Sequence, residues 1–258
     1  MAKSKIDYAD WSWGIVDGCT HSGHPGCDNC WAKAMADRFW KDRKFSDVQI
    51  HPERLDEVIK LKPQVVFVAP MGDLFHKDVP DDIIEKAFIT MGLKARQHKY
   101  ILFTKRPERM REFMNGSHEF VQDHIWLGVS VSTQKDVNEF LPILCDTSAG
   151  KRIVSAEPLL EYIDMSYFLN GCPEYDGYGE YGYPGWVQTC APINGIFTGC
   201  ESGTNRRKAN IDWFRSLRNQ CEKTKVKYYL KQMEVDGNIV HKPLLDGRQW
   251  LEFPERNA

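Results

Sequence analysis

Short runs of β-branched and aromatic residues alternate with longer amphipathic segments along this chain of 258 residues. This alternation is typical of βα units on a parallel sheet, since each parallel connection needs a crossover that is usually a helix. We predict strands at 13–16, 65–69, 100–104, 125–131, 152–155, 195–198 and 226–230. We predict the intervening helices at 29–43, 80–97, 107–114, 134–145, 159–169 and 211–224. Because seven strands can close or nearly close a ring, the sequence predicts the α/β class, with residues 1–258 forming a single domain that is a partial or near-complete (β/α) barrel of the TIM type.

A segment rich in glycine, tyrosine and proline at about 170–193 interrupts this rhythm. It has neither a helical nor a strand period, and loops longer than about 12–15 residues without structure of their own are commonly lids or binding loops. Its aromatic residues favour an ordered loop that faces a ligand, and the alternative is a packed insertion that covers a barrel edge. We therefore expect an insertion in the barrel at this point.

The net charge and the hydropathy of the sequence limit the partners and cellular locations that we expect for this chain. The formal net charge is only −2, so a nucleic-acid partner would have to meet a local basic patch. No run of about 18 apolar residues is present to span a bilayer, and the N-terminal stretch MAKSKIDYADWSWG has no apolar core of a secretory signal. We expect a cytoplasmic protein that does not contact a membrane.

Three of the eight cysteines lie in one short loop, GCTHSGHPGCDNC at 18–30, between a predicted strand and a predicted helix. Their spacing, C-x7-C-x2-C, supplies soft thiolates from Cys19, Cys27 and Cys30 without an obvious fourth ligand. A [4Fe-4S] cluster that leaves one iron open for a substrate or cofactor needs such a ligand set. In a reducing compartment, cysteines favour metal binding or free thiols over a disulfide framework. This loop is therefore the predicted metal site.

Polar side chains follow each of the later predicted strands. The carboxyl ends of the strands of a (β/α) barrel meet at one mouth, where active sites lie. In chain order, the candidate site residues at these ends are Met71, Gly72, Asp73, Lys105, Arg106, Ser130, Ser132, Ser155, Glu157, Cys200, Glu201 and Lys231. Any one of them alone is more easily a turn or cap residue. Their joint convergence with the cysteine loop predicts an active site at this mouth.

The chain resembles the radical S-adenosylmethionine superfamily and, within it, the phage-associated three-cysteine-motif proteins of unassigned function. The resemblance covers almost the whole chain except the aromatic insertion. The matching motifs are GC-x7-GC-x2-CWA at 18–32, MGDLFH at 71–76, LFTKRPERM at 102–110, LGVSV at 127–131, SAEPLL at 155–160, GCESG at 199–203, DWFRSLRNQC at 212–221, LKQM at 230–233 and LLDGRQW at 244–250.

This resemblance implies an enzyme in which the cofactors carry the chemistry and the protein positions them. Cys19, Cys27 and Cys30 would hold a [4Fe-4S] cluster, and S-adenosylmethionine would chelate its open iron. One electron from an external donor would then cleave the sulfonium to a 5'-deoxyadenosyl radical, which abstracts hydrogen from the substrate.

The resemblance also implies roles for the strand-end residues. Met71, Gly72 and Asp73 match the segment that meets the methionine amino group, and Lys105 or Arg106 would meet its carboxylate through charge-assisted hydrogen bonds. Ser130 and Ser132 would lie near the ribose. The residues that would face ribose, adenine or substrate are Ser155, Glu157, Glu201, Ser202, Lys231 and Gln232. Cys200 is a candidate hydrogen-atom donor, with a buried small hydrophobe as its alternative.

The substrate expected from the resemblance is a nucleobase or hypermodified nucleotide in phage DNA, so that a phage-encoded protein would act in the host cytoplasm. The oligomeric state stays open. The alternative to a cluster is zinc, because His21 or His24 would complete a Cys3His site. The chain would then be a zinc-stabilised nucleic-acid-binding protein without redox chemistry. Its basic groups would come from 105–111 and 206–208. The alternative interpretation of 206–208, without a binding role, is a solvated helix start.

Overall fold

Seven adjacent parallel strands form the centre of a nine-stranded sheet in the computed structural model, which describes residues 1–172, 191–203 and 205–253. Their order is β2 (Trp11–Trp13), β5 (Val65–Val68), β6 (Lys99–Thr104), β7 (Ile125–Val131), β8 (Lys151–Ala156), β9 (Gly195–Gly199) and β10 (Lys227–Val235). Antiparallel strands flank them, β1 (Ala2–Lys3) next to β2 and β11 (Asn238–His241) next to β10. The predicted α/β class with a mostly parallel sheet is confirmed.

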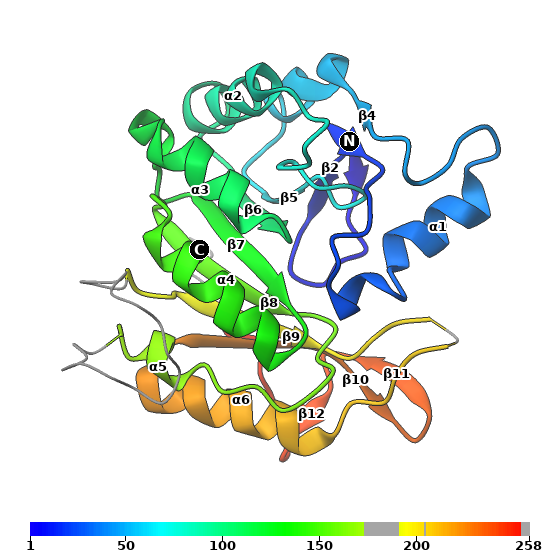
Figure 1. Ribbon diagram of the computed structural model, residues 1–258, viewed down its shortest axis with the longest axis vertical. Coiled ribbons are helices and arrows are strands. Elements are labelled where there is room, and N and C mark those ends of the chain that lie inside the picture. The colour runs from blue at the N-terminus through cyan, green and yellow to red at the C-terminus, as the bar shows by residue number, and fades with distance from the viewer. Residues whose placement is uncertain (173–190, 204, 254–258) are drawn as a thin grey trace.

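Helices connect these strands and cover one face of the sheet (Figure 1). They are α1 (Trp31–Phe39), α2 (Asp81–Ile89), α3 (Pro107–Asn115), α4 (Gln134–Asp146), α5 (Ser166–Leu169) and α6 (Ile211–Thr224). Three shorter segments are 3-10 helical, Pro25–Cys27, Pro52–Val58 and His118–Phe120, and Thr90–Lys94 is a π-helical turn. Two small antiparallel strand pairs lie outside the main sheet. They are β3 (Val16–Asp17) with β4 (Gln49–Ile50) and β12 (Leu244–Leu245) with β13 (Arg248–Gln249). Most of the insertion predicted at 170–193 lies outside the described residues.

The helix predicted at 159–169 is wrong over its first part, since only Ser166–Leu169 is helical. The amide of Leu159 donates to the carbonyl of Gly199, and the amide of Leu160 donates to the carbonyl of Ser132. Gly199 is the last residue of β9 and Ser132 directly follows β7, so both amides bond to strand ends.

The two faces of the sheet explain why its strands are almost continuously apolar. On one face, alternate residues of the strands pack with the helices in the main core, among them Val66, Leu102 and Leu127. The opposite face carries a second cluster, in which the ring of Tyr8 contacts four aromatic residues of the strands. Its centroid lies 4.7 Å from Phe197, 5.9 Å from Tyr229, 6.0 Å from Phe67 and 6.4 Å from Phe103. A parallel sheet that is buried on both faces needs apolar side chains on both.

Candidate functional site

The register of the parallel strands places several predicted site residues on the aromatic face. Ser130 pairs with Ser155, and Ser155 pairs in turn with Phe197 of that face. Since side chains two residues apart in a strand share a face, Ser130 and Ser155 belong to this face. Lys231 lies two residues beyond Tyr229, at the carboxyl end of the same face. The apolar floor of the face thus gives way to polar groups at the strand ends.

Glu157 and Lys231 meet at this edge. The Lys231 Nζ atom lies 2.6 Å from Glu157 Oε2, and their side chains are only 18% and 12% exposed, respectively. Tyr8 lies beneath the pair, with Lys231 Nζ 5.7 Å from its ring centroid. Burial, followed by the charge of Glu157, raises the pKa of Tyr8 well above its usual value, so this hydroxyl stays protonated. The pair therefore closes the polar end of an aromatic floor.

Two buried polar atoms at this edge have no hydrogen-bond partner among the described residues, Ser132 Oγ and Glu157 Oε1. Ser132 is completely buried. Native proteins satisfy nearly all buried polar groups, and each exception needs an explanation such as a ligand or water that completes it. Both atoms belong to predicted cofactor-binding residues, and they are the only such atoms in the described parts of the chain.

The cysteine loop lies against this edge of the sheet. The start of the loop is held beside the segment that follows β5. The amide of Gly18 donates to the carbonyl of Met71 at 2.9 Å, and Gly18 forms an isolated parallel β-bridge with Gly72. The middle of the loop reaches the end of β7, where a Cβ atom on Gly26 would come within 2.3 Å of Ser132 Oγ. The loop therefore reaches from the end of β5 to the end of β7, with the unpartnered hydroxyl of Ser132 directly beneath it.

This contact predicts an unusual suppressor. Gly26→Ala is expected to destabilise the chain by about 1–3 kcal/mol, because Ser132 is buried and has no room to yield. Adding Ser132→Ala removes the clashing oxygen and is expected to restore most of that loss. Urea unfolding of the two single variants and the double variant tests this. Equal destabilisation of the Gly26→Ala chain with and without Ser132→Ala would contradict the contact.

Arg106 fastens the first part of the loop. Its guanidinium donates to Cys19 Sγ at 3.4 Å, to the Thr20 carbonyl at 3.0 Å and to Asp73 Oδ2 at 2.8 Å. The carboxylate of Asp73 also accepts bonds from the Thr104 hydroxyl and the Phe75 amide, so it is fixed. Burial raises the pKa of Cys19, and the charge of Arg106 opposes that rise. Asp73 thus orients a guanidinium that partly offsets the rise in the pKa of Cys19, while the charge of Asp73 itself adds to that rise.

Arg207 fastens the second part of the loop from the segment that follows β9. It donates to the Pro25 carbonyl at 2.8 Å and to Asp28 Oδ2 at 3.2 Å, and it pairs with the buried carboxylate of Glu201. Asn29, between the second and third cysteines, donates to the same carboxylate at 2.8 Å. Burial acts to raise the pKa of Glu201, but the bonds from Arg207 and Asn29 outweigh it and lower the pKa. Glu201 therefore remains ionised as the anchor of this contact.

His24 forms a third attachment. Its Nδ1 atom lies 2.8 Å from Asp136 Oδ1, and its ring packs on Phe140 with centroids 4.4 Å apart. Asp136 is buried and also accepts the amides of Ser132 and Thr133, which open α4. The histidine therefore holds the loop against the start of α4.

The three cysteines of the loop are free thiols, each half-buried. Cys27 Sγ lies 3.2 Å from Ser22 Oγ, and Cys19 and Cys30 pack against the cluster of Ala32, Ala36 and Phe45. Within residues 1–172, 191–203 and 205–253, no three histidine, cysteine or acidic side chains stand together as a group that could hold a metal. The fourth zinc ligand considered above is also engaged elsewhere, since His21 bonds Asp28 at 3.0 Å and His24 bonds Asp136.

The comparison with protein families gives one match. A family model described as a protein of unknown function (DUF5131) matches residues 3–254. The chain belongs to the DUF5131 family. Searches of curated proteins and of solved structures give no significant match. In the described residues of this DUF5131 chain, none of the helices has the length and apolar content that a membrane crossing requires.

The structure does not bring every predicted residue to the edge of the DUF5131 sheet. Cys200 is buried in the main core with the helices, where burial raises its pKa to about 11. Lys105 lies beside the loop, with its Cε atom 3.5 Å from where a Cβ on Gly26 would stand. Cys172 is disulfide-bonded. Ser130 and Ser155 lie on the aromatic face of the sheet, and the other candidates lie at the loop or at the Glu157–Lys231 pair.

The basic groups of the nucleic-acid alternative are mostly engaged within the chain. Arg206 pairs with Glu234 at 2.6 Å, and Arg207 holds the cysteine loop. In the other patch, Arg106 pairs with Asp73 and Arg109 with Asp81. A solvated helix start is therefore a wrong interpretation of Arg206 and Arg207.

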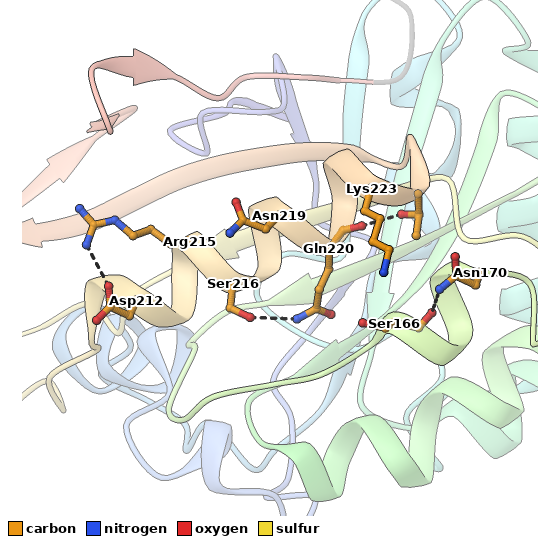
Figure 2. Close-up of a pocket in the computed structure, with 9 residues that line it drawn as sticks. Ser166, Asn170, Asp212, Arg215, Ser216, Asn219, Gln220 and Lys223 are labelled. Carbon is orange, nitrogen blue, oxygen red and sulfur yellow. Dashed lines mark hydrogen bonds and ion pairs between the residues drawn. The ribbon is translucent and has the colours of Figure 1, made fainter.

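A surface depression away from the cysteine loop lies between α5 and α6 (Figure 2). Its polar side chains bond one another and the nearby backbone. Gln220 donates to Ser216 Oγ at 3.1 Å, Asn170 donates to the Ser166 carbonyl at 2.7 Å, and Arg215 pairs with Asp212. It contains none of the predicted site residues, and we place the site at the cysteine loop instead.

Proposed function

We propose that this DUF5131 protein is a radical S-adenosylmethionine enzyme that binds a [4Fe-4S] cluster and S-adenosylmethionine at the carboxyl edge of a partial (β/α) barrel. The observation that carries the proposal is the cysteine loop, which is fastened to this edge above Ser132 Oγ, one of two buried polar atoms at the edge that have no partner among the described residues. Cys19, Cys27 and Cys30 would hold the cluster. When bound, it would supply the one-electron reduction of S-adenosylmethionine that makes a hydrogen-abstracting radical available.

The donor chemistry of the loop suits this cofactor. Three free, half-buried thiols are soft ligands, and no fourth protein ligand joins them among the described residues. Arg106 places positive charge at Cys19, which opposes the rise in the pKa of this thiol that burial causes. Since the sulfurs do not yet form a metal-holding group, cluster assembly is expected to require a local movement of the loop.

The unpartnered atoms suit the second ligand. A buried hydroxyl at Ser132 and a buried carboxylate oxygen at Glu157 are available to accept or donate bonds to the hydroxyl groups of a ribose. Lys105, next to Gly26, forms no ion pair among the described residues and offers an ammonium group to a carboxylate. Asp73 is already saturated by Thr104 and Arg106, so in this structure it orients Arg106. Glu201 likewise anchors the loop.

The proposed substrate is a nucleobase or nucleotide in DNA, and it is supported by the sequence resemblance alone. An external one-electron donor would be required as a partner. The proposed place of action is the cytoplasm, that of the host if the protein is phage-encoded.

Cluster content tests the proposed function directly. Protein purified and reconstituted without oxygen is expected to contain about four iron and about four sulfide ions per chain, with broad visible absorption. Cys27→Ala should lose most of this iron, whereas Cys145→Ala should keep it because Cys145 is buried in the main core. One zinc per chain, with no visible absorption, would overturn the proposal in favour of the zinc alternative.

A further inference from the structure

One face of α1 exposes three large apolar side chains. Trp31, Met35 and Phe39 follow one another at intervals of four residues and are 43%, 42% and 58% exposed. Residues at this spacing lie on the same side of a helix. Single exposed apolar residues are common, but a contiguous stripe of an aromatic, a methionine and a second aromatic is typical of a protein interface. We call these three residues the α1 stripe.

The opposite face of α1 contacts the cysteine site. Ala32 and Ala36 are buried and, with Phe45, pack against Cys19 and Cys30. Cys30 is also the residue that caps the start of the helix. A helix is about 10 Å across, so anything bound to the α1 stripe lies about one helix diameter from the cysteines. Figure 1 shows α1 at the periphery of the molecule, beyond the edge of the sheet.

The surface around the α1 stripe carries unpaired positive charge. Arg38, Lys41 and Lys44 are exposed and form no ion pair within the described parts of the chain. Asp42 is the only unpaired carboxylate within residues 31–44, since Asp37 pairs with Lys33. A second copy of the chain would bring like charges together across a twofold axis. An acidic partner would complement them.

We infer that the α1 stripe is the docking surface for a small acidic protein that carries one electron at a time. The inference rests on the proposed function, because a cluster at the cysteine loop needs an external electron. Apolar contact at the α1 stripe would hold the carrier, and its carboxylates would meet Arg38, Lys41 and Lys44. A single helix then separates the carrier from Cys19 and Cys30.

The test is direct binding of the reconstituted full chain to a purified flavodoxin, measured by calorimetry at low salt. Phe39→Ala and Met35→Ala are expected to weaken binding about tenfold or more, since a few exposed aromatic and methionine anchors dominate such interfaces. Leu93→Ala is the matched control, because Leu93 is 71% exposed and lies far from α1 in the sequence. It should bind like the parent chain. Lys41→Glu should weaken binding at low salt and reduce its salt dependence.

Iron content separates this inference from the proposed function. Phe39→Ala should keep the iron of the parent chain and slow the rate at which reduced flavodoxin bleaches the visible absorption. If the parent chain holds its cluster but flavodoxin does not bind, or binds Phe39→Ala and the parent equally, the inference is wrong while the proposed function stands. If these variants instead lose affinity for single-stranded DNA and not for flavodoxin, the surface binds nucleic acid and the inference is overturned.

Discussion

Replacing Arg207 with alanine is expected to release the second half of the cysteine loop and to cut the iron content after reconstitution at least severalfold. Arg207 connects the Pro25 carbonyl and Asp28 to Glu201, so its loss removes all three contacts together. The variant also leaves the carboxylate of Glu201, which is only 3% exposed, without its cation. We expect a loss of about 2 kcal/mol in unfolding free energy, below the range for fully buried pairs because Arg207 is 35% exposed.

The matched control removes the stranded charge. In Arg207→Ala/Glu201→Gln, no ionised group is left without a partner, so part of the stability is expected to return while the loop remains loose. Iron binding should therefore stay low in the double variant even as stability recovers. If iron content followed stability in both variants, Arg207 would act through folding alone.

The pH dependence of this effect has a definite sign. The pKa of Glu201 is lowered in the folded chain, so the carboxylate binds its proton less readily there than in the unfolded chain. The stability that this contributes is present above the unfolded pKa of about 4.3. It is lost as the pH falls through the lowered folded pKa. The difference in unfolding free energy between the parent chain and Arg207→Ala should therefore be full at neutral pH and shrink in acid.

The fold was largely predictable because the strands of a parallel sheet buried on both faces are continuously apolar. The strand predicted at 13–16 is displaced, since β2 is Trp11–Trp13 and Val16 pairs separately with Ile50. Trp13, Ile15 and Val16 are nevertheless all fully buried. Apolar periodicity identifies what is buried there, while the partner strands decide which residues form the ladder.

The position of the cysteine loop followed from the ends of the strands, but its attachments did not. His24 meets Asp136 at a separation of 112 residues, and Arg207 meets Pro25 at 182. A single sequence carries no local signal for such pairs. The basic run at 206–208 resembles a solvated helix start because its acidic partners lie on other segments. Tyr8 was missed for the same reason, since it precedes the first strand predicted from the sequence and only the folded chain brings it under Glu157.

Replacing Lys231 with methionine is expected to be among the most damaging single changes at the site. Methionine keeps most of the length and apolar surface of lysine, so the main loss is the charge that pairs with Glu157. Both side chains are mostly buried, and removing one partner of such a pair costs about 3–5 kcal/mol, because the remaining charge is stranded. The protonated hydroxyl of Tyr8 offers only a neutral partner. Urea unfolding should show the loss.

The double variant Lys231→Met/Glu157→Gln distinguishes a binding site from a structural ion pair. It strands no charge, so most of the stability is expected to return. Glu157 Oε1 has no hydrogen-bond partner among the residues that the structure describes. If that oxygen serves S-adenosylmethionine, the double variant should still bind this ligand at least tenfold more weakly than the parent. Calorimetry on reconstituted protein measures this. If binding recovered together with stability, Glu157 would serve the fold and not the ligand. Glu157 Oε1 would then no longer support the proposed ligand site, which would rest on Ser132 Oγ alone.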